Sequence, residues 1–359
     1  MSYTRNCISC LLILFVALTC EAYSGFIGVN DAHFELNGSP FLFNGFNSYW
    51  LMHVAAEPAE RYKVTEVLRD ASLLGLYVCR TGLLVMEVIE HYKYHLAALN
   101  VVVCLGFGFC DLEAKKYGVR LILSFVNQWN DFGGKSQYVR WARNAGSYIS
   151  SDDDFYTHPM LKTFYKNHIE KVVTRLNSIT RVAYRDDPTI MAWELMNEPR
   201  DQADYSGKPL IFVKSLDNKH LLEVGMEGFY VGTDFISNHL INEIDFATIH
   251  AYTDQCDDAQ LAWMERWITS HWKDSRTILK KPLVLAEFGK SSRGQGSRDT
   301  FMNSVYRNGS LVWQLMAHGM ENYDDGYCIV LGQSPSTTQI ISDQSHVMTA
   351  LAHSFNQPH

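Results

Sequence analysis

Eight short apolar runs recur along the 359-residue chain, and they constrain its fold more than any other feature. Each has the length of a strand and few polar residues inside it, as is typical of parallel strands buried on both faces. With helix-like segments between them, they predict an α/β fold, a (β/α)8 barrel of the TIM type. The runs are Phe41–Phe46, Leu76–Arg80, Arg120–Phe125, Ile190–Leu195, Leu221–Val224, Phe246–Ile249, Leu283–Ala286 and Leu311–Trp313.

The clearest helices are expected at Glu57–Leu74, Tyr156–Ile179 and Asp257–Leu279, where apolar residues recur at helical spacing. The last of these carries three tryptophans, which we interpret as packing against the barrel rather than as a platform for a ligand. They are Trp263, Trp267 and Trp272. No repeat or low-complexity linker divides the chain, so residues 24–359 are expected to form a single domain.

Polar and aromatic side chains follow all eight runs. In a barrel, the carboxyl ends of the strands meet at one rim, where the chemistry of such enzymes is found. We therefore expect an active site at this rim. The strand ends read Asn44-Gly45-Phe46-Asn47, Arg80-Thr81, Asn127-Gln128-Trp129-Asn130, Asn197-Glu198-Pro199, Glu227-Gly228, His250-Ala251-Tyr252, Glu287-Phe288-Gly289 and Trp313-Gln314.

Two glutamates, Glu198 and Glu287, directly follow the fourth and the seventh run. Cleavage of a glycosidic bond with retention needs two carboxyl groups about 5–5.5 Å apart. One of them protonates the leaving oxygen, and the other attacks the anomeric carbon. Because the two residues are far apart in sequence, only closure of the barrel can bring them together.

Other residues at the strand ends suit this chemistry. Asn197 can bond to the 2-hydroxyl of the sugar. Arg80 can keep the attacking carboxylate ionised by lowering its pKa, and Tyr252 can donate to the same carboxylate. His250 can orient a hydroxyl group or the acid/base, and Trp313 offers an apolar face to a sugar ring. Taken singly, each of these residues is more often structural.

The segment Trp193–Pro199 resembles the acid/base signature of glycoside hydrolase family 5, and Leu285–Lys290 resembles its nucleophile strand. Four narrower motifs resemble the plant endo-β-mannanases of that family. The resemblance runs from about residue 25 to the C-terminus. The four motifs are Phe43–Met52, Asn127–Gly134, Ile249–Tyr252 and Gly309–Gln314.

The resemblance implies internal hydrolysis of β-1,4-mannosidic bonds with retention and without a cofactor. The implied substrate is a cell-wall polysaccharide: mannan, glucomannan or galactomannan. Glu198 takes the position of the general acid/base, and Glu287 takes that of the nucleophile. The other active-site positions of the family are taken by Arg80, Asn197, His250, Tyr252 and Trp313.

Residues 82–110 depart from the family pattern, which continues with a tryptophan, a polar loop and a helix. Here an apolar stretch follows, which a misjoined exon or a diverged paralogue would explain. His91 and His95 have the spacing of a helical metal pair, but no third ligand accompanies them, so we predict no metal site. Gly106-Phe107-Gly108 lacks the third glycine of a dinucleotide site.

Other elements are shorter than in the family. Truncated helices are expected between Gly207 and Val213 and between Arg307 and Gly309, and a short loop at Tyr230–Gly232. Cys256 stands where the family has a tryptophan that contacts substrate. Loss of a barrel helix would destabilise the fold by several kcal/mol, at about 25 cal/mol per Å² of apolar surface. Two alternatives therefore remain: a catalytically weak or inactive relative that binds polysaccharide or folds poorly, and a β-1,4-glucanase.

The first 23 residues are predicted to be a signal peptide. Arg5 precedes the apolar run Leu11–Leu18, and small residues lie near a cleavage site at Cys20–Ala22. The alternative, a membrane anchor, is disfavoured because the run is too short to cross a bilayer. We therefore expect a secreted protein, extracellular or in the cell wall.

Composition argues against several partners. The net charge is −8 and no long basic run occurs, so nucleic acid is not expected as a partner. No later apolar stretch is long enough to cross a membrane. Five of the eight cysteines remain after residue 23, and the odd count leaves at least one thiol unpaired. We expect a monomer.

Overall fold

The computed structural model describes residues 25–83, 101–131, 133–200, 208–231, 234–253, 257–294, 296–307 and 309–355. The predicted signal peptide lies outside the described residues. So do His91, His95 and Cys256, together with one residue of the Arg307–Gly309 junction. The structure therefore leaves these predictions untested.

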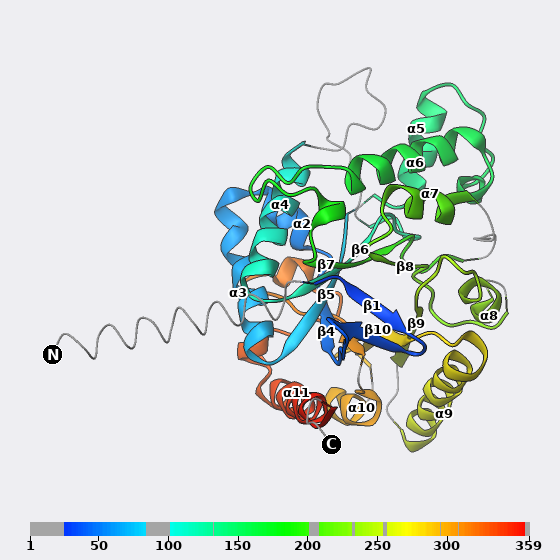
Figure 1. The fold of residues 1–359 in the computed structure, drawn as a ribbon. Coiled ribbons are helices and arrows are strands. Elements are labelled where there is room, and N and C mark those ends of the chain that lie inside the picture. The colour runs from blue at the N-terminus through cyan, green and yellow to red at the C-terminus, as the bar shows by residue number, and fades with distance from the viewer. Residues whose placement is uncertain are drawn as a thin grey trace.

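Eight parallel strands form one curled sheet in the order β8-β7-β6-β5-β4-β11-β10-β9 (Figure 1). Each strand overlaps one of the eight predicted runs, so the predicted α/β barrel is confirmed. The strands are β4 (Asn44–Asn47), β5 (Leu76–Gly82), β6 (Arg120–Ser124), β7 (Ile190–Glu194), β8 (Leu221–Glu223), β9 (Ala247–Thr253), β10 (Leu283–Lys290) and β11 (Ser310–Val312).

The two end strands, β8 and β9, pair in no regular ladder, and single backbone hydrogen bonds link each of them to a residue just outside the other. The amide of Asp245 donates to the carbonyl of Leu222 at 2.8 Å, and the amide of His250 donates to the carbonyl of Glu227 at 3.0 Å. These bonds link the ends of the sheet at both its lower and its upper rim. The curl brings the strand ends that carry polar residues to one side of the molecule.

A small antiparallel sheet plugs the opposite end of the barrel. Its strands are β1 (Ile27–Asn30), β2 (His33–Leu36) and β3 (Ser39–Pro40). The ring of Phe34 lies 5.5 Å from that of Phe43 and 5.3 Å from that of Phe246, and all three rings are buried. Their apolar surface closes the bottom of the barrel, which leaves the upper rim as the open end.

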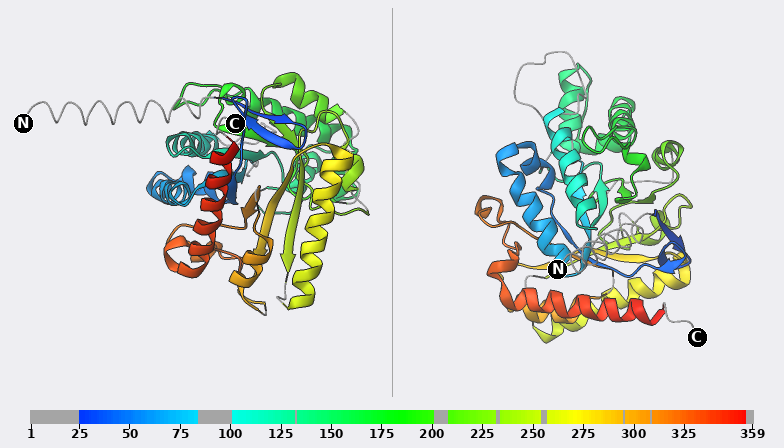
Figure 2. Two further views of the ribbon diagram at one scale, coloured as in Figure 1. Left: turned by 60° about the horizontal axis from the view of Figure 1, so that its bottom comes forward. Right: turned by 60° about the vertical axis from the view of Figure 1, so that its left-hand side comes forward.

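Helices cover the outside of the sheet (Figures 1 and 2). The α-helices are α2 (Leu51–Ala56), α3 (Arg61–Leu73), α4 (Val101–Lys116), α5 (Lys135–Asn144), α6 (Pro159–Val173), α7 (Lys208–Leu216), α8 (Phe235–His239), α9 (Asp258–Asp274), α10 (Arg298–Val305) and α11 (Pro335–Phe355). Shorter turns of helix are Pro58–Glu60, Asp152–Tyr156, Tyr184–Asp186, Ser275–Leu279, Glu321–Tyr323 and Leu331–Gln333. The three clearest predicted helices are thus confirmed by α3, α6 and α9. None of the described helices has the length and apolar character that crossing a bilayer requires.

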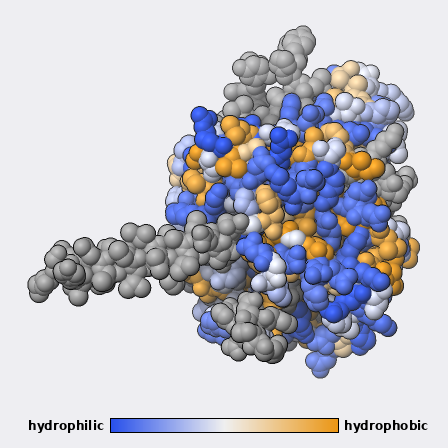
Figure 3. Space-filling view, viewed as in Figure 1, coloured by the Kyte–Doolittle hydropathy of each residue, from blue (hydrophilic) through white to orange (hydrophobic). Residues whose placement is uncertain are grey.

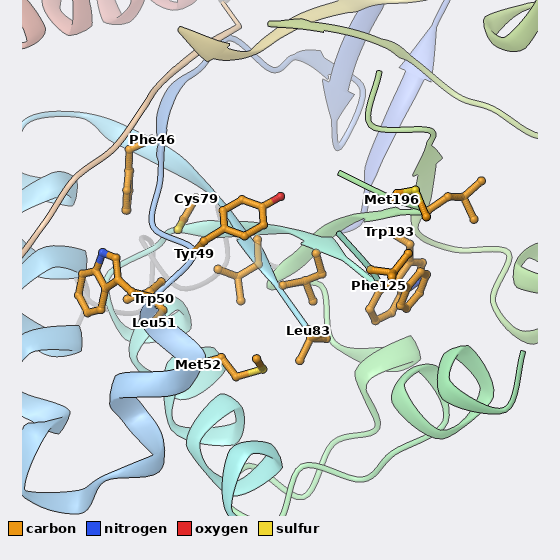
Figure 4. Packing of buried hydrophobic residues seen from close by; sticks show 14 of the residues in the cluster. Phe46, Tyr49, Trp50, Leu51, Met52, Cys79, Leu83, Phe125, Trp193 and Met196 are labelled. Carbon is orange, nitrogen blue, oxygen red and sulfur yellow. The ribbon is translucent and has the colours of Figure 1, made fainter. Parts of the chain in front are cut away.

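The main core lies between the strands and these helices. Figure 4 shows the rings of Phe125 and Trp193 lying against each other, with centroids 5.3 Å apart and planes 15° from parallel. Trp50 and Leu51, at the start of α2, are buried in the same cluster. Large side chains from β7, from the residue after β6 and from the start of α2 thus fix how the helices pack on the sheet.

The end of the atypical segment 82–110 forms part of this core. Residues from Val101 onwards belong to α4, which packs closely on α2. A Cβ at Gly106 would lie 2.6 Å from the backbone nitrogen of Ala56, so the close approach requires glycine there. Phe107 is buried against the ring of Tyr184. The segment therefore supplies a barrel helix, which its apolar composition favours.

The outer layer is thin where shortened elements were predicted. α7 has 9 residues, α8 has 5 and α10 has 8. On α9, Trp267 packs on the core as predicted, but Trp263 and Trp272 are 51% and 53% exposed, so the packing prediction was wrong for these two. Trp263 stacks on Trp267 one turn away. Trp272 lies about 140° around the helix axis from Trp267, so it faces another direction. On the face drawn in Figure 3, hydrophobic residues are interspersed with charged and polar ones.

Candidate active site

A cleft of about 610 Å³ lies at the carboxyl ends of the barrel strands. Five of the seven predicted site residues line it, and the other two, Arg80 and His250, lie beneath its surface as partners of the glutamates. The lining residues are Tyr49, Trp50, Asn127, Trp129, Asp131, Asn197, Glu198, Arg200, Glu227, Tyr252, Glu287, Trp313, Gln314, Tyr323, Asp325 and Tyr327.

The two predicted glutamates face each other across this cleft. A carboxyl oxygen of Glu198, one of Glu287 and a ring nitrogen of His250 all lie within 4.8 Å of one another. Both glutamates are buried, with 8% and 3% of their surface exposed. Closure of the barrel has therefore brought together two carboxyl groups from strands that are not neighbours.

Glu198 is held from two sides. The indole nitrogen of Trp129 donates to one carboxyl oxygen at 2.5 Å, and Nδ1 of His250 lies 2.7 Å from the other. The backbone of Glu198 has φ = 52°, a left-handed conformation that is strained for a residue with a side chain. Burial raises the pKa of the Glu198 carboxyl, but the bonds from His250 and Trp129 outweigh it and lower this pKa to about 2.

Glu287 has different partners. Nη1 of Arg80 donates to one oxygen at 2.6 Å, and the hydroxyl of Tyr252 donates to the other at 2.5 Å. Burial raises the pKa of Glu287, while His250 and Arg80 lower it by less, so the net shift is upward. The predicted contacts are present. The expectation that Arg80 lowers the pKa of Glu287 below its usual value is wrong, because burial raises this pKa by more than Arg80 lowers it.

A bulge in β10 sets the position of Glu287. Its register against β9 shifts between Leu285 and Glu287, so Glu287 pairs with His250 across the two strands. The side-chain amide of Asn47 donates to the backbone carbonyl of Ala286 at 2.8 Å, within the bulge. Bulges of this kind re-aim a side chain at the end of a strand.

Arg80 is fully buried beneath the cleft, where it links several of the site residues through hydrogen bonds. It makes two bonds to Glu194, at 2.5 and 2.7 Å, besides its bond to Glu287. Its Nη2 also donates to Oδ1 of Asn197 at 2.8 Å, which leaves the amide of Asn197 to donate to Asn127 at 3.0 Å. Arg80 therefore touches the residues that line the cleft rather than the cleft itself.

Trp313 forms one wall of the cleft. Its ring lies 5.5 Å from that of Tyr49, and its indole nitrogen donates to Asp325 at 2.8 Å. The peptide bond between Trp313 and Gln314 is cis. The bond to Asp325 holds the indole against a loop that follows the last barrel strand.

Several residues at the site were not among those predicted. Glu194 has a detectable signal, because it is an acidic residue inside an apolar strand. Trp129 lies in a strand-end motif but gained no role from sequence alone. Arg200, whose guanidinium lies 4.7 Å over the ring of Trp129, and Asp325 are brought to the cleft by folded loops, for which the sequence offers no signal.

A metal ion has two candidate groups among the described residues. Glu198, His250 and Glu287 are close enough to bind one, but Trp129, Tyr252 and Arg80 already occupy their carboxyl oxygens, and Arg80 is itself a cation. The other group is the exposed set Asp324, Asp325 and Cys328. Its Asp325 is engaged by Trp313 and Gln314.

Comparison with known proteins identifies similar chains. The family model described as GH family 5 beta-mannosidase-like matches residues 24–308. Mannan endo-1,4-beta-mannosidase 1 of Solanum lycopersicum is 72% identical over 397 aligned positions, which cover 99% of this chain and 100% of the relative. Mannan endo-1,4-beta-mannosidase 7 of Arabidopsis thaliana is 42% identical and covers 91% of this chain and 86% of its own. The 397-position alignment is longer than the 359-residue chain, so the first relative has stretches that this chain lacks.

Solved structures agree with the fold. The endo-1,4-beta-D-mannanase of Thermotoga petrophila RKU-1 superposes with a TM-score of 0.72 at 28% identity, covering 86% of this chain and 100% of that one. The endo-1,4-beta-mannanase of Rhizomucor miehei superposes with a TM-score of 0.75 at 25% identity, covering 91% and 100%.

Proposed function

Since the chain belongs to glycoside hydrolase family 5 and its β-mannosidase-like group, we propose that it hydrolyses internal β-1,4-mannosidic bonds with retention. The preferred substrates are cell-wall mannan, glucomannan and galactomannan. Relatives of 72% and 70% identity, each aligned over 99% of the chain, support the enzyme class mannan endo-1,4-β-mannosidase.

One observation carries the proposal: carboxyl oxygens of Glu198 and Glu287 lie within 4.8 Å of each other in an open cleft. Inverting enzymes keep their two carboxyl groups about 6.5–9.5 Å apart to leave room for a water molecule. The short separation leaves no such room and favours direct attack by one carboxylate on the sugar.

Glu287 is the nucleophile in this mechanism. Arg80 and Tyr252 each donate to one of its oxygens and fix the carboxylate toward the cleft. Its lone pair attacks the anomeric carbon as the bond to the leaving oxygen breaks, which gives a glycosyl-enzyme ester. Asn197, held by Arg80 and Asn127, lies where it can bond to the sugar 2-hydroxyl, and this bond strengthens in the transition state.

Glu198 and His250 supply the proton together. With a pKa of about 2, Glu198 alone would be ionised, whereas contacts with Glu287 and Glu198 outweigh the effect of burial and raise the pKa of His250. The 2.7 Å contact lets the pair hold one proton as a unit. This proton passes through Glu198 to the leaving oxygen. Glu198 then deprotonates the water that hydrolyses the ester, which restores the starting configuration.

The walls of the cleft suit a chain of sugars. Trp129, on the side of β6, offers a 42% exposed ring. Trp313, Tyr323 and Tyr327 lie on the side of β11 and the loop after it. Aromatic faces on more than one wall of an open cleft favour a substrate with several sugar rings. We also propose secretion, on the strength of the predicted signal peptide.

The test uses the purified secreted protein with mannan and with cellulose oligomers. We expect turnover of mannan, with internal cleavage seen as a rapid fall in viscosity, and loss of turnover in Glu198→Gln and Glu287→Gln. Preferential turnover of cellulose oligomers would replace the substrate with a β-1,4-glucan. Mannan binding without turnover would favour the inactive relative that the short helices α7, α8 and α10 suggest.

A further inference from the structure

A second carboxyl pair lies beneath the cleft, where the mechanism gives it no role. Glu194 on β7 and Glu223 on β8 occupy paired positions of neighbouring parallel strands. Neither residue has any solvent-exposed surface. Glu194 is the partner of Arg80, so this pair lies one residue away from the group that holds Glu287.

The hydrogen bonds of Glu223 are asymmetric. Its Oε2 accepts bonds from the backbone amide of Gly225 and, at 3.2 Å, from the hydroxyl of Thr248. Its Oε1 is buried and accepts no hydrogen bond from any residue in the described part of the chain. The side chain of Glu194 is within hydrogen-bond reach of Glu223. Two carboxylates cannot bond to each other unless one of them carries a proton.

The charges beneath the cleft indicate where that proton lies. Arg80 brings one positive charge, and it is already bonded to Glu194 and Glu287. A third carboxylate in the same buried space would be an unpaired charge, which is costly in a protein interior. Burial first, and the neighbouring Glu194 second, raise the pKa of Glu223 well above its usual value. Arg80 stabilises the ionised form of Glu194, whose pKa is lowered.

We propose that Glu223 is a neutral carboxylic acid whose hydroxyl donates to Glu194, which makes Glu223 a positioning residue that directs Arg80 toward Glu287. This role rests on the proposed function of Glu287 as the nucleophile. The chain of contacts runs from Glu223 through Glu194 and Arg80 to Glu287. The links of Arg80 to Glu194 and to Glu287 are observed hydrogen bonds, the link from Glu223 to Glu194 is the proposed one, and all four side chains are at least 97% buried.

Gly225 keeps the acid in place. Its φ is +90°, and a Cβ there would lie 1.9 Å from the carbonyl oxygen of Met196 and 3.0 Å from Cδ of Glu194. The amide of Gly225 therefore reaches Oε2 of Glu223 only because the residue has no side chain. With Oε2 occupied, Oε1 is the oxygen that remains to carry the proton toward Glu194.

The protonation state can be measured without any substrate. Infrared spectra of the full-length protein in D₂O at pH 7 are compared between wild type and Glu223→Gln. We expect the wild-type spectrum to contain a carbonyl band of a protonated carboxylic acid that is missing in the variant. Absence of this band from the difference spectrum would mean that Glu223 is ionised and would overturn the inference.

The positioning role is measured with an aryl β-mannoside or aryl mannobioside whose leaving group needs no protonation. The acidic limb of kcat/KM then reports the ionisation of Glu287 in the free enzyme. In Glu223→Gln the amide still donates to Glu194, so we expect kcat within about threefold of wild type and an unchanged acidic limb. In Glu223→Leu the donor is lost, and we expect kcat to fall about 10–100-fold and the acidic limb to move to higher pH.

A matched control is Asp111→Asn, which changes another buried carboxyl that bonds to Asn177 outside the cleft. It should leave the acidic limb where it is. An unshifted limb in Glu223→Leu, or equal losses in the Gln and Leu variants, would overturn the positioning role. If the Leu variant does not fold, the infrared band and the Gln variant still decide. Failure of the proposed function would appear separately, as an active Glu287→Gln enzyme.

Discussion

The rim of the barrel and its outer helical layer differ sharply in how well their side chains are buried and bonded. At the rim, every predicted site residue is buried or lines the cleft, and each glutamate has two hydrogen-bond partners. In the outer layer, α7, α8 and α10 are short, and Trp263 and Trp272 on α9 are half exposed. The rim is fixed by strand ends, whereas the outer layer depends on helices that cover the strands.

This difference suggests a division in the fold, with the proposed chemistry at the rim and much of the stability in the helical cover. The strands are held by the ladders between them and by the interior side chains, so the rim keeps its geometry even where the cover is thin. We expect changes at the rim to alter activity far more than stability. Changes in the outer layer should do the reverse.

The largest effect is expected for Glu287→Gln. Removal of the proposed nucleophile should lower kcat on mannan by about 10⁴-fold or more, as for other residues that form a covalent intermediate. Circular dichroism should show an unchanged fold. Activity within tenfold of wild type would break the distinction between the two regions, because the rim would then not carry the chemistry.

The next largest effect is expected for Arg80→Lys. Lysine keeps the charge but cannot make two bonds to Glu194 while it also bonds to Glu287 and Asn197. We expect kcat/KM to fall about 100-fold. The surface variant Arg69→Lys, at an exposed ion pair on α3, is the control and should be neutral. A wild-type kcat/KM in Arg80→Lys would show that the buried network around Arg80 is not needed for activity.

A smaller effect is expected for Trp129→Phe, which removes the indole bond to Glu198 and keeps an aromatic ring in the wall. Because that bond lowers the pKa of Glu198, its loss should raise this pKa. We expect kcat to fall about tenfold, given the strength of a hydrogen bond to a charged group. The pH profile of kcat/KM should also change, whereas Trp272→Phe in the outer layer should leave it unchanged.

The two glutamates should have opposite effects on stability. The pKa of Glu287 is raised in the folded state, so its ionisation destabilises the fold as pH rises through that pKa. Glu287→Gln should therefore melt a few degrees higher than wild type at pH 7, and the gain should vanish in acid. The pKa of Glu198 is lowered to about 2, so it stabilises the fold above its unfolded pKa and loses this contribution as pH falls toward 2. Glu198→Gln should melt lower at pH 7, and this difference should shrink as pH falls toward 2, which calorimetry between about pH 2 and pH 7 can check.

The smallest effect is expected for Trp263→Ser on the outer face of α9. Because the ring is half exposed and stacks mainly on Trp267, we expect a loss of about 0.5–1 kcal/mol in the free energy of unfolding. Mannan turnover should stay at the wild-type level. A marked loss of turnover would mean that the outer layer takes part in the chemistry after all.

Much of the fold could be predicted because barrel strands leave a strong pattern. Each of β4 to β11 overlaps a predicted apolar run, and the polar residues after them do gather at one rim. The pairing of Glu198 with Glu287 also followed from the strand ends. It could be anticipated because parallel strands in a closed sheet must present their carboxyl ends together.

The rest depends on interactions that sequence patterns do not encode. Burial raises the pKa of Glu287, whereas His250 and Arg80 lower it, and only the folded geometry shows which of these opposing effects is larger. Asp325 reaches Trp313 through a loop after β11 that has no periodicity. The exposure of Trp263 and Trp272 depends on which neighbours cover α9, which helical spacing alone does not reveal.

The proposed mechanism is tested most directly by trapping its glycosyl-enzyme intermediate. The enzyme is incubated with a 2-deoxy-2-fluoro mannoside that carries a good leaving group, and the protein is digested and analysed by mass spectrometry. We expect one covalent sugar adduct, on the Glu287 side chain of the peptide that contains it. An adduct on Glu198, or rapid hydrolysis to a product of inverted configuration without any adduct, would contradict the mechanism.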